Sequence, residues 1–131
     1  MPKGSSSSVR VFYPEFNQAH LLQILSERLK LLEERLPLIR VVLIGSYAKG
    51  NYNVGSDVDL LIVYKGEARA DAYAIAKRSL DIPRLEPHLY SEEEYGKMKE
   101  TIHKMSEGGI LLFSCKTSGP TYVFFHGIFL N

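Results

Sequence analysis

Residues 44–64 read IGSYAKGNYNVGSDVDLLIVY, and the rest of the chain can be interpreted around this stretch. An apolar run ends at Gly45, a polar segment with several glycines follows, and a Ser-Asp-Val-Asp sequence opens a second apolar run. Because side chains alternate along a strand, Asp57 and Asp59 are expected to lie on one face. Two carboxylates at the start of a buried strand are costly unless a positive charge lies between them. A divalent metal ion would satisfy both, so the stretch predicts a metal site.

The composition is typical of a single globular domain. The chain has 131 residues, of which 45% are hydrophobic, enough for a real core. Its 16 basic and 15 acidic residues nearly balance, which argues against a general nucleic-acid binder. Cys115 is the single cysteine, so an intrachain disulfide and a cysteine-rich zinc site are excluded.

The sequence carries no signal for a membrane or for secretion. No apolar run approaches the ~20 residues that a membrane span needs. Residues 1–8 lack the apolar segment of a signal peptide and are expected to form a disordered tail. The expected compartment is therefore the cytoplasm, with no membrane partner.

An amphipathic helix is predicted over about residues 15–36. Its leucines recur at alternating intervals of three and four residues, at Leu22, Leu25, Leu29, Leu32 and Leu36. Pro37 ends the helix. Such a stripe could form a coiled-coil seam, but it lasts only about two heptads. Packing on the chain's own sheet is the favoured interpretation.

Further elements follow from local patterns. Strands are predicted at residues 38–44, 56–64, 84–90 and 110–114, and helices at residues 68–80 and from Ser91 to about Met105. The first two strands are joined by a loop too short for a standard crossover helix, so they could be antiparallel or part of a mixed sheet. Pro87 favours an edge position for the strand that contains it. Ser91 and Glu94 fit a capping box at a helix start.

The predicted architecture is an α/β (or α+β) domain with a small mixed sheet of about four to five strands and helices packed on it. We expect the domain to span residues 9–115. Residues 9–13 could be a short strand or an extended lead-in. Residues 116–131 form a tail of uncertain structure, which could be a strand pair, a partner-facing segment or non-native sequence.

The loop after residue 44 has the chemistry of a phosphate site. Gly45 allows close approach of the backbone, Ser46 adds a hydroxyl donor, and Lys49 lies about one turn further on. Ser56 completes the candidate nucleotide-binding residues. The loop lacks the Gly-Lys-Ser/Thr ending of a P-loop and the spacing of a dinucleotide fingerprint. Taken alone, it could equally be a simple turn.

A third carboxylate is expected to complete a two-metal site, and Glu86 is the best candidate. An acid within an apolar strand needs a reason to be there. If Glu86 faces Asp57 and Asp59, it would bind metal and act as general base for an acceptor hydroxyl. It could instead be an edge-strand acid in solvent, with Asp81 as the fallback. His88 could contact a phosphate or the acceptor, but an edge-strand residue without a chemical role is favoured.

These motifs resemble the signature of the DNA polymerase β-like nucleotidyltransferase superfamily, most closely its minimal nucleotidyltransferase branch. The resemblance rests on residues 45–50, on residues 56–60 and on the strand around Glu86. It implies transfer of a nucleoside monophosphate from an NTP, usually ATP, to a hydroxyl, with two Mg²⁺ ions as cofactors. By position, Gly45 and Ser46 would hold the triphosphate, while Asp57, Asp59 and Glu86 would bind metal.

The resemblance also implies a partner. Members of this branch often act as the antitoxin beside a helical HEPN-domain protein, in some cases by adenylylating it. A protein acceptor is favoured over nucleic acid because the net charge is near zero. A binding module that neutralises its partner by masking it is the alternative, and homodimers or hetero-oligomers both fit. Lys49 departs from the family's frequent arginine, and Glu86 from its frequent aspartate.

Overall fold

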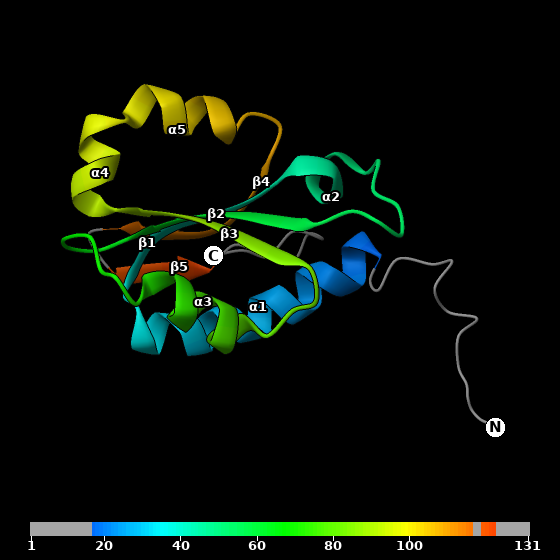
Figure 1. Cartoon of the computed structure of the whole chain (residues 1–131), viewed down its shortest axis with the longest axis horizontal. Coiled ribbons are helices and arrows are strands. Elements are labelled where there is room, and N and C mark those ends of the chain that lie inside the picture. Colours follow the sequence, from blue (N-terminus) through cyan, green and yellow to red (C-terminus); the bar gives the residue numbers. More distant parts are fainter. Residues whose placement is uncertain (1–16, 117–118, 123–131) are drawn as a thin grey trace.

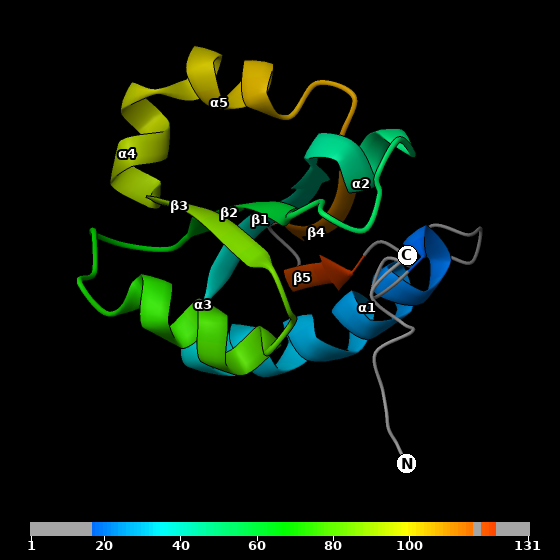
Figure 2. The same ribbon diagram turned by 45° about the vertical axis from the view of Figure 1, so that its right-hand side comes forward.

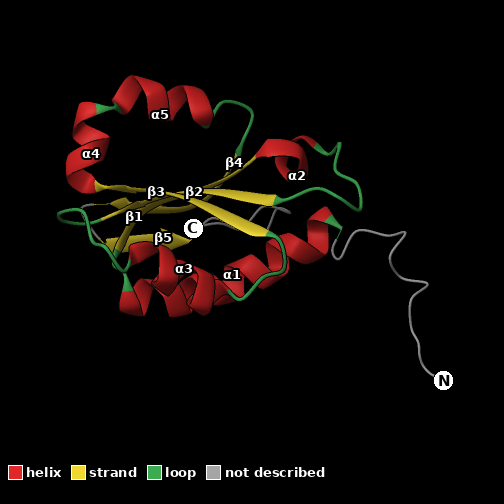
Figure 3. Cartoon of the chain, in the orientation of Figure 1, coloured by secondary structure: helices red, strands yellow, loops and turns green. Residues whose placement is uncertain are grey.

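The computed structural model describes residues 17–116 and 119–122, and in this part of the chain helices cover both faces of a sheet (Figures 1 and 3). The elements in chain order are α1 (Gln18–Arg35), β1 (Leu38–Ile44), α2 (Gly45–Lys49), β2 (Val58–Tyr64), α3 (Ala72–Leu80), β3 (Leu85–Ser91), α4 (Glu92–Lys97), α5 (Lys99–Met105), β4 (Ile110–Lys116) and β5 (Gly119–Tyr122). This confirms the predicted α/β architecture with a small mixed sheet. Within the described ranges, no helix is both long and apolar enough to cross a membrane.

The sheet has five strands in the order β3-β2-β1-β4-β5. The β1–β2 pair is antiparallel, which settles the alternative left open by the short loop. The β2–β3 pair is parallel, with α3 in the connection between the two strands. This register places Glu86 beside Asp59, although 27 positions separate them in the sequence (86 − 59). The mixed sheet therefore brings the acids of two strands together.

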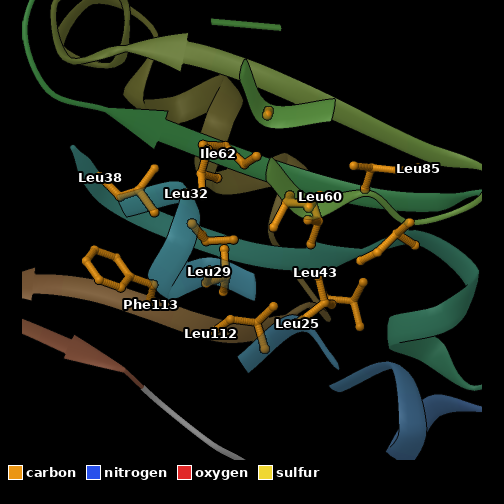
Figure 4. Close-up of a cluster of buried hydrophobic side chains, with 14 of the residues drawn as sticks. Leu25, Leu29, Leu32, Leu38, Leu43, Leu60, Ile62, Leu85, Leu112 and Phe113 are labelled. Atoms are coloured by element: carbon orange, nitrogen blue, oxygen red, sulfur yellow. The ribbon is translucent and has the colours of Figure 1, made fainter. Parts of the chain in front are cut away.

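The main core lies between the sheet and the pair α1 and α3. Figure 4 shows leucines of α1 packed against strand side chains such as Leu43, Leu60 and Phe113. The fully buried leucines within α1 are Leu21, Leu25, Leu29 and Leu32. The predicted stripe began at Leu22, which is only partly buried. The Arg28 guanidinium also donates to the carbonyl oxygens of Leu80 and Asp81, at 2.7 and 2.8 Å, and so joins α1 to the end of α3.

A smaller core lies on the opposite face, under α4 and α5 (Figure 2). Ile102 of α5 is buried against Val42 and Leu61. The capping box of Ser91 and Glu94 is present as predicted. However, the single helix expected from Ser91 to Met105 is two helices that meet at Met98, whose backbone is non-helical at φ −120° and ψ 27°. Gly96 precedes the break, and a glycine inside a helix costs about 1 kcal/mol relative to alanine.

Other boundaries differ by a few residues from those predicted. Helix α3 starts at Ala72 rather than residue 68, with Asp71 at the N-cap position. The start of the predicted C-terminal tail includes strands: β4 runs to Lys116, and β5 pairs with it in antiparallel fashion. The expectations for residues 1–8, 9–13 and 123–131 lie outside the described residues.

Candidate active site

Asp59 occupies a central place at the start of β2. Ile44, the last residue of β1, pairs with it on one side, and Glu86 of β3 pairs with it on the other. Neighbouring strands lie ~4.8 Å apart, and paired residues point to the same face. Asp59 also shares its face with Leu61, which packs under α5. The two carboxylates of Asp59 and Glu86 therefore arise side by side on the face that α4 and α5 cover further along.

Gly45 brings the loop backbone directly against Asp59. Its φ is +77°, a left-handed backbone conformation that residues with a side chain rarely adopt. A Cβ atom built on Gly45 would lie 2.6 Å from Oδ2 of Asp59. Glycine is thus required twice, by the backbone conformation and by the carboxylate. In this structure the loop backbone approaches Asp59, and the predicted approach of Gly45 to a phosphate stays a prediction.

Helix α1 holds the loop in place. Tyr47 is buried and stacks on Tyr52, with ring centroids 4.3 Å apart. The Gln18 side chain donates to the carbonyl oxygen of Tyr47 at 2.7 Å, and the Gln18 backbone N–H donates to the Tyr52 hydroxyl at 3.0 Å. The loop is therefore tied to the first residue of α1. The predicted loop residues Ser46 and Lys49 are half-buried and exposed, respectively.

Ser56 has a structural task in this arrangement. Its hydroxyl accepts a hydrogen bond from the Asn53 backbone N–H at 2.8 Å. The Asn53 side chain in turn accepts from the Gly55 backbone N–H, also at 2.8 Å. These bonds close the turn that leads into Asp57 and β2. A nucleotide contact from Ser56 stays a prediction.

Arg84 is a residue that the sequence reasoning missed. Its guanidinium donates to the carbonyl oxygens of Gly55 and Ser56, at 2.7 and 3.2 Å, and lies 3.5 Å from Oδ1 of Asp57. Its carbonyl accepts from the Val58 N–H at 2.9 Å, which starts the β2–β3 ladder. The Asp57 side chain is 57% exposed, so this ion pair is worth at most about 1 kcal/mol. No motif marked Arg84, because it lies in the turn before β3.

His88 contacts Asp59 directly. Its Nε2 lies 3.1 Å from Oδ1 of Asp59. A carboxylate can only accept, so the imidazole is the donor. The sequence reasoning favoured no chemical role for His88. The available signal was its alternation with Glu86, which places both side chains on one face of β3.

The oxygen donors of this region suit magnesium. Carboxylates are the ligands that Mg²⁺ prefers, and the missing Cβ of Gly45 leaves room for Oδ2 of Asp59 to lie against the loop. The register puts Asp59 and Glu86 together, whereas the exposed Asp57 faces Arg84. Among the side chains of the described residues, no three His, Cys, Asp or Glu residues form a ready-made group for a metal ion. The metal set of Asp57, Asp59 and Glu86 thus stays a prediction.

Comparison with known proteins identifies relatives. The sequence model of a family described as "nucleotidyltransferase domain" matches residues 23–111, which include all the candidate site residues. The structure is similar to the crystal structure, at 1.40 Å resolution, of a candidate nucleotidyltransferase from Sulfolobus solfataricus. That similarity has a TM-score of 0.57 and 22% sequence identity, covers 79% of this chain and 87% of the other, and supports the fold. A search of curated proteins found no match.

Proposed function

Because the chain belongs to the nucleotidyltransferase domain family, we propose that it transfers a nucleoside monophosphate, AMP from ATP, to a hydroxyl group on a partner protein. The acceptor oxygen would attack the α-phosphorus of the nucleotide, and pyrophosphate would leave. The observation that carries this proposal is the convergence of Gly45, Asp59 and Glu86 at the start of β2. A backbone loop suited to a phosphate and carboxylates suited to a cation meet there.

The proposed roles follow from these positions. Asp57, Asp59 and Glu86 would bind Mg²⁺, two ions by the family resemblance, which when bound neutralise the triphosphate charge and make the acceptor hydroxyl more acidic. Gly45 and Ser46 would hold the triphosphate, with Lys49 as a nearby exposed cation. Glu86 is exposed on the edge strand, where it could also take the proton of an incoming hydroxyl.

We propose a HEPN-domain protein as the partner, with this chain as its antitoxin. The support is the family resemblance and a net charge of +1, which offers no general attraction for nucleic acid. The helices and strands of the described residues carry the side chains proposed for the nucleotide-donor side of the reaction. The acceptor hydroxyl would therefore be brought by the docked partner.

The alternative function is a binding module that neutralises the partner by masking it, with weak or no catalysis. The observation that favours it is the ion pair between Arg84 and Asp57 at 3.5 Å. A guanidinium beside this carboxylate competes with a metal ion for the same charge. The two functions differ in whether neutralisation depends on the carboxylates.

The test begins with a search of the neighbouring genes for a HEPN-domain protein, which is then purified and combined with this chain. The first measurement follows AMP transfer from ATP to that protein by intact mass spectrometry, with Mg²⁺ present or chelated. The second measures partner neutralisation by wild type and by the double variant Asp57→Asn/Asp59→Asn. Loss of both transfer and neutralisation in the variant supports catalysis. Loss of transfer with full neutralisation supports the masking function. No transfer by wild type contradicts the proposed enzyme.

A further inference from the structure

The carboxylate of Asp59 is contacted from two sides, and each oxygen has a different neighbour. Oδ1 accepts the hydrogen bond from Nε2 of His88 on β3, at 3.1 Å. Oδ2 is the atom that a Cβ on Gly45 would meet at 2.6 Å. The two contacts come from opposite sides of β2, because β3 and β1 flank it in the sheet. The rotation of the carboxylate is therefore determined by a side chain on one side and a backbone on the other.

The strand around His88 places its ring with little freedom. His88 pairs with Leu61 of β2, one alternation beyond the Asp59–Glu86 pair. Its neighbour Leu89 points to the other face, where it packs against the main core. The His88 side chain is only 36% exposed. Leu89 thus anchors the edge strand on the face covered by α1 and α3. His88 is held on the opposite face, within reach of Asp59.

From this geometry we propose that His88 is a positioning residue. It donates its Nε2–H to Oδ1 of Asp59 and so keeps Oδ2 turned toward Gly45, where the metal–nucleotide complex would bind. The inference rests on the proposed function. It gives His88 a role in the site beside the three proposed metal ligands. Removal of such a hydrogen-bond partner typically weakens metal affinity by about 10–100-fold.

A direct metal contact by His88 is the competing explanation. Two ligand atoms on one octahedral ion lie about 3 Å apart when each is ~2.1 Å from it, a spacing that the observed contact would also allow. The hydrogen bond is favoured because His88 contacts Oδ1, whereas Oδ2 is the carboxylate oxygen that lies nearest to Gly45. The two explanations differ in whether a histidine nitrogen binds the ion.

The experiment measures binding of Mn²⁺, used in place of Mg²⁺, together with a non-hydrolysable ATP analogue, by calorimetry. His88→Leu should bind this complex about 10–100-fold more weakly than wild type. His88→Gln should retain most of the affinity, because its amide N–H can take the place of Nε2–H. His103→Gln is the matched control, since His103 lies on α5, where its ring contacts Tyr95 rather than Asp59. Urea unfolding of each variant separates lost binding from lost folding.

Pulsed EPR of the Mn²⁺ complex tests the unsubstituted chain, with and without ¹⁵N-labelled histidine. We expect no coupling from a histidine nitrogen bound to the ion. Such a coupling, or an unchanged affinity in a folded His88→Leu variant, would overturn the positioning role while leaving the proposed function intact. If His88→Leu fails to fold, the role is overturned when His88→Gln itself binds the complex about 10–100-fold more weakly than wild type. No binding by wild type would overturn the proposed function and this inference together.

Discussion

Replacement of Gly45 by alanine tests the contact on which the candidate site depends. An L-residue at φ +77° costs about 1–2 kcal/mol in backbone strain. The new Cβ, 2.6 Å from Oδ2 of Asp59, would also force the carboxylate to rotate away from His88. A hydrogen bond to a charged group contributes about 1.5–3 kcal/mol, and about 1–2 here because both side chains are partly exposed. We therefore expect Gly45→Ala to lower the free energy of unfolding by about 2–4 kcal/mol.

Gly50→Ala is the matched control. Gly50 has nearly the same conformation, at φ +82°, but nothing lies within 4 Å of a Cβ built on it. Its replacement should cost only the backbone strain of about 1–2 kcal/mol. The excess for Gly45, about 1–2 kcal/mol, measures the carboxylate contact.

A double-mutant cycle supplies these values. Urea unfolding is measured for wild type, Gly45→Ala, Asp59→Ala and the double variant, and the free energies are comparable when the dependence on urea concentration is the same in each. In an Asp59→Ala background the carboxylate is gone, so Gly45→Ala should cost no more than Gly50→Ala. Calorimetry should show that Gly45→Ala also loses metal–nucleotide binding. Equal costs for Gly45→Ala and Gly50→Ala in the wild-type background would refute the reasoning.

Three further predictions concern the rest of the domain. Leu29→Ala, which empties a fully buried position of α1, should lower the free energy of unfolding by about 2–5 kcal/mol in urea titrations. Arg69 lowers the pKa of Asp71 by a side-chain hydrogen bond, so Arg69→Gln should raise that pKa toward its usual 3.8 in an NMR titration. The lowered pKa means that this pair's contribution is present at neutral pH and is lost as the pH falls through the pKa of Asp71 in the folded chain. Asp81→Gly should leave stability unchanged or raise it by up to about 1 kcal/mol in thermal unfolding, because Asp81 ends α3 at φ +46°, where glycine is favoured.

The spacing of apolar residues predicted most of the helices and strands, because it indicates which side chains are buried. The leucine spacing of α1 and the apolar runs of β1 and β2 mark faces that the core must cover. The break at Met98 was missed, since the apolar period continues through it to Ile102. Periodicity records which residues face inward, and two short helices packed on the same face preserve it.

The site was predictable only in part, because local sequence patterns do not determine which strands pair or in which register. Asp57 and Asp59 share a motif, and Glu86 was singled out as an acid in an apolar strand. The Asp59–Glu86 register and the His88 contact depend on a parallel pairing across α3. Arg84 acts mainly through bonds to carbonyl groups, which any sequence supplies.

The outer edge of β3 has a consequence for how the molecule meets other chains. Arg84 bonds toward β2, so by alternation the backbones of Leu85, Pro87, Leu89 and Ser91 face outward. The Leu85 carbonyl accepts from Lys77, the Ser91 N–H donates to Glu94, and Pro87 has no N–H to offer. Such an edge resists pairing with a foreign strand. The strand that carries Glu86 and His88 can therefore remain at the border of the sheet without inviting aggregation.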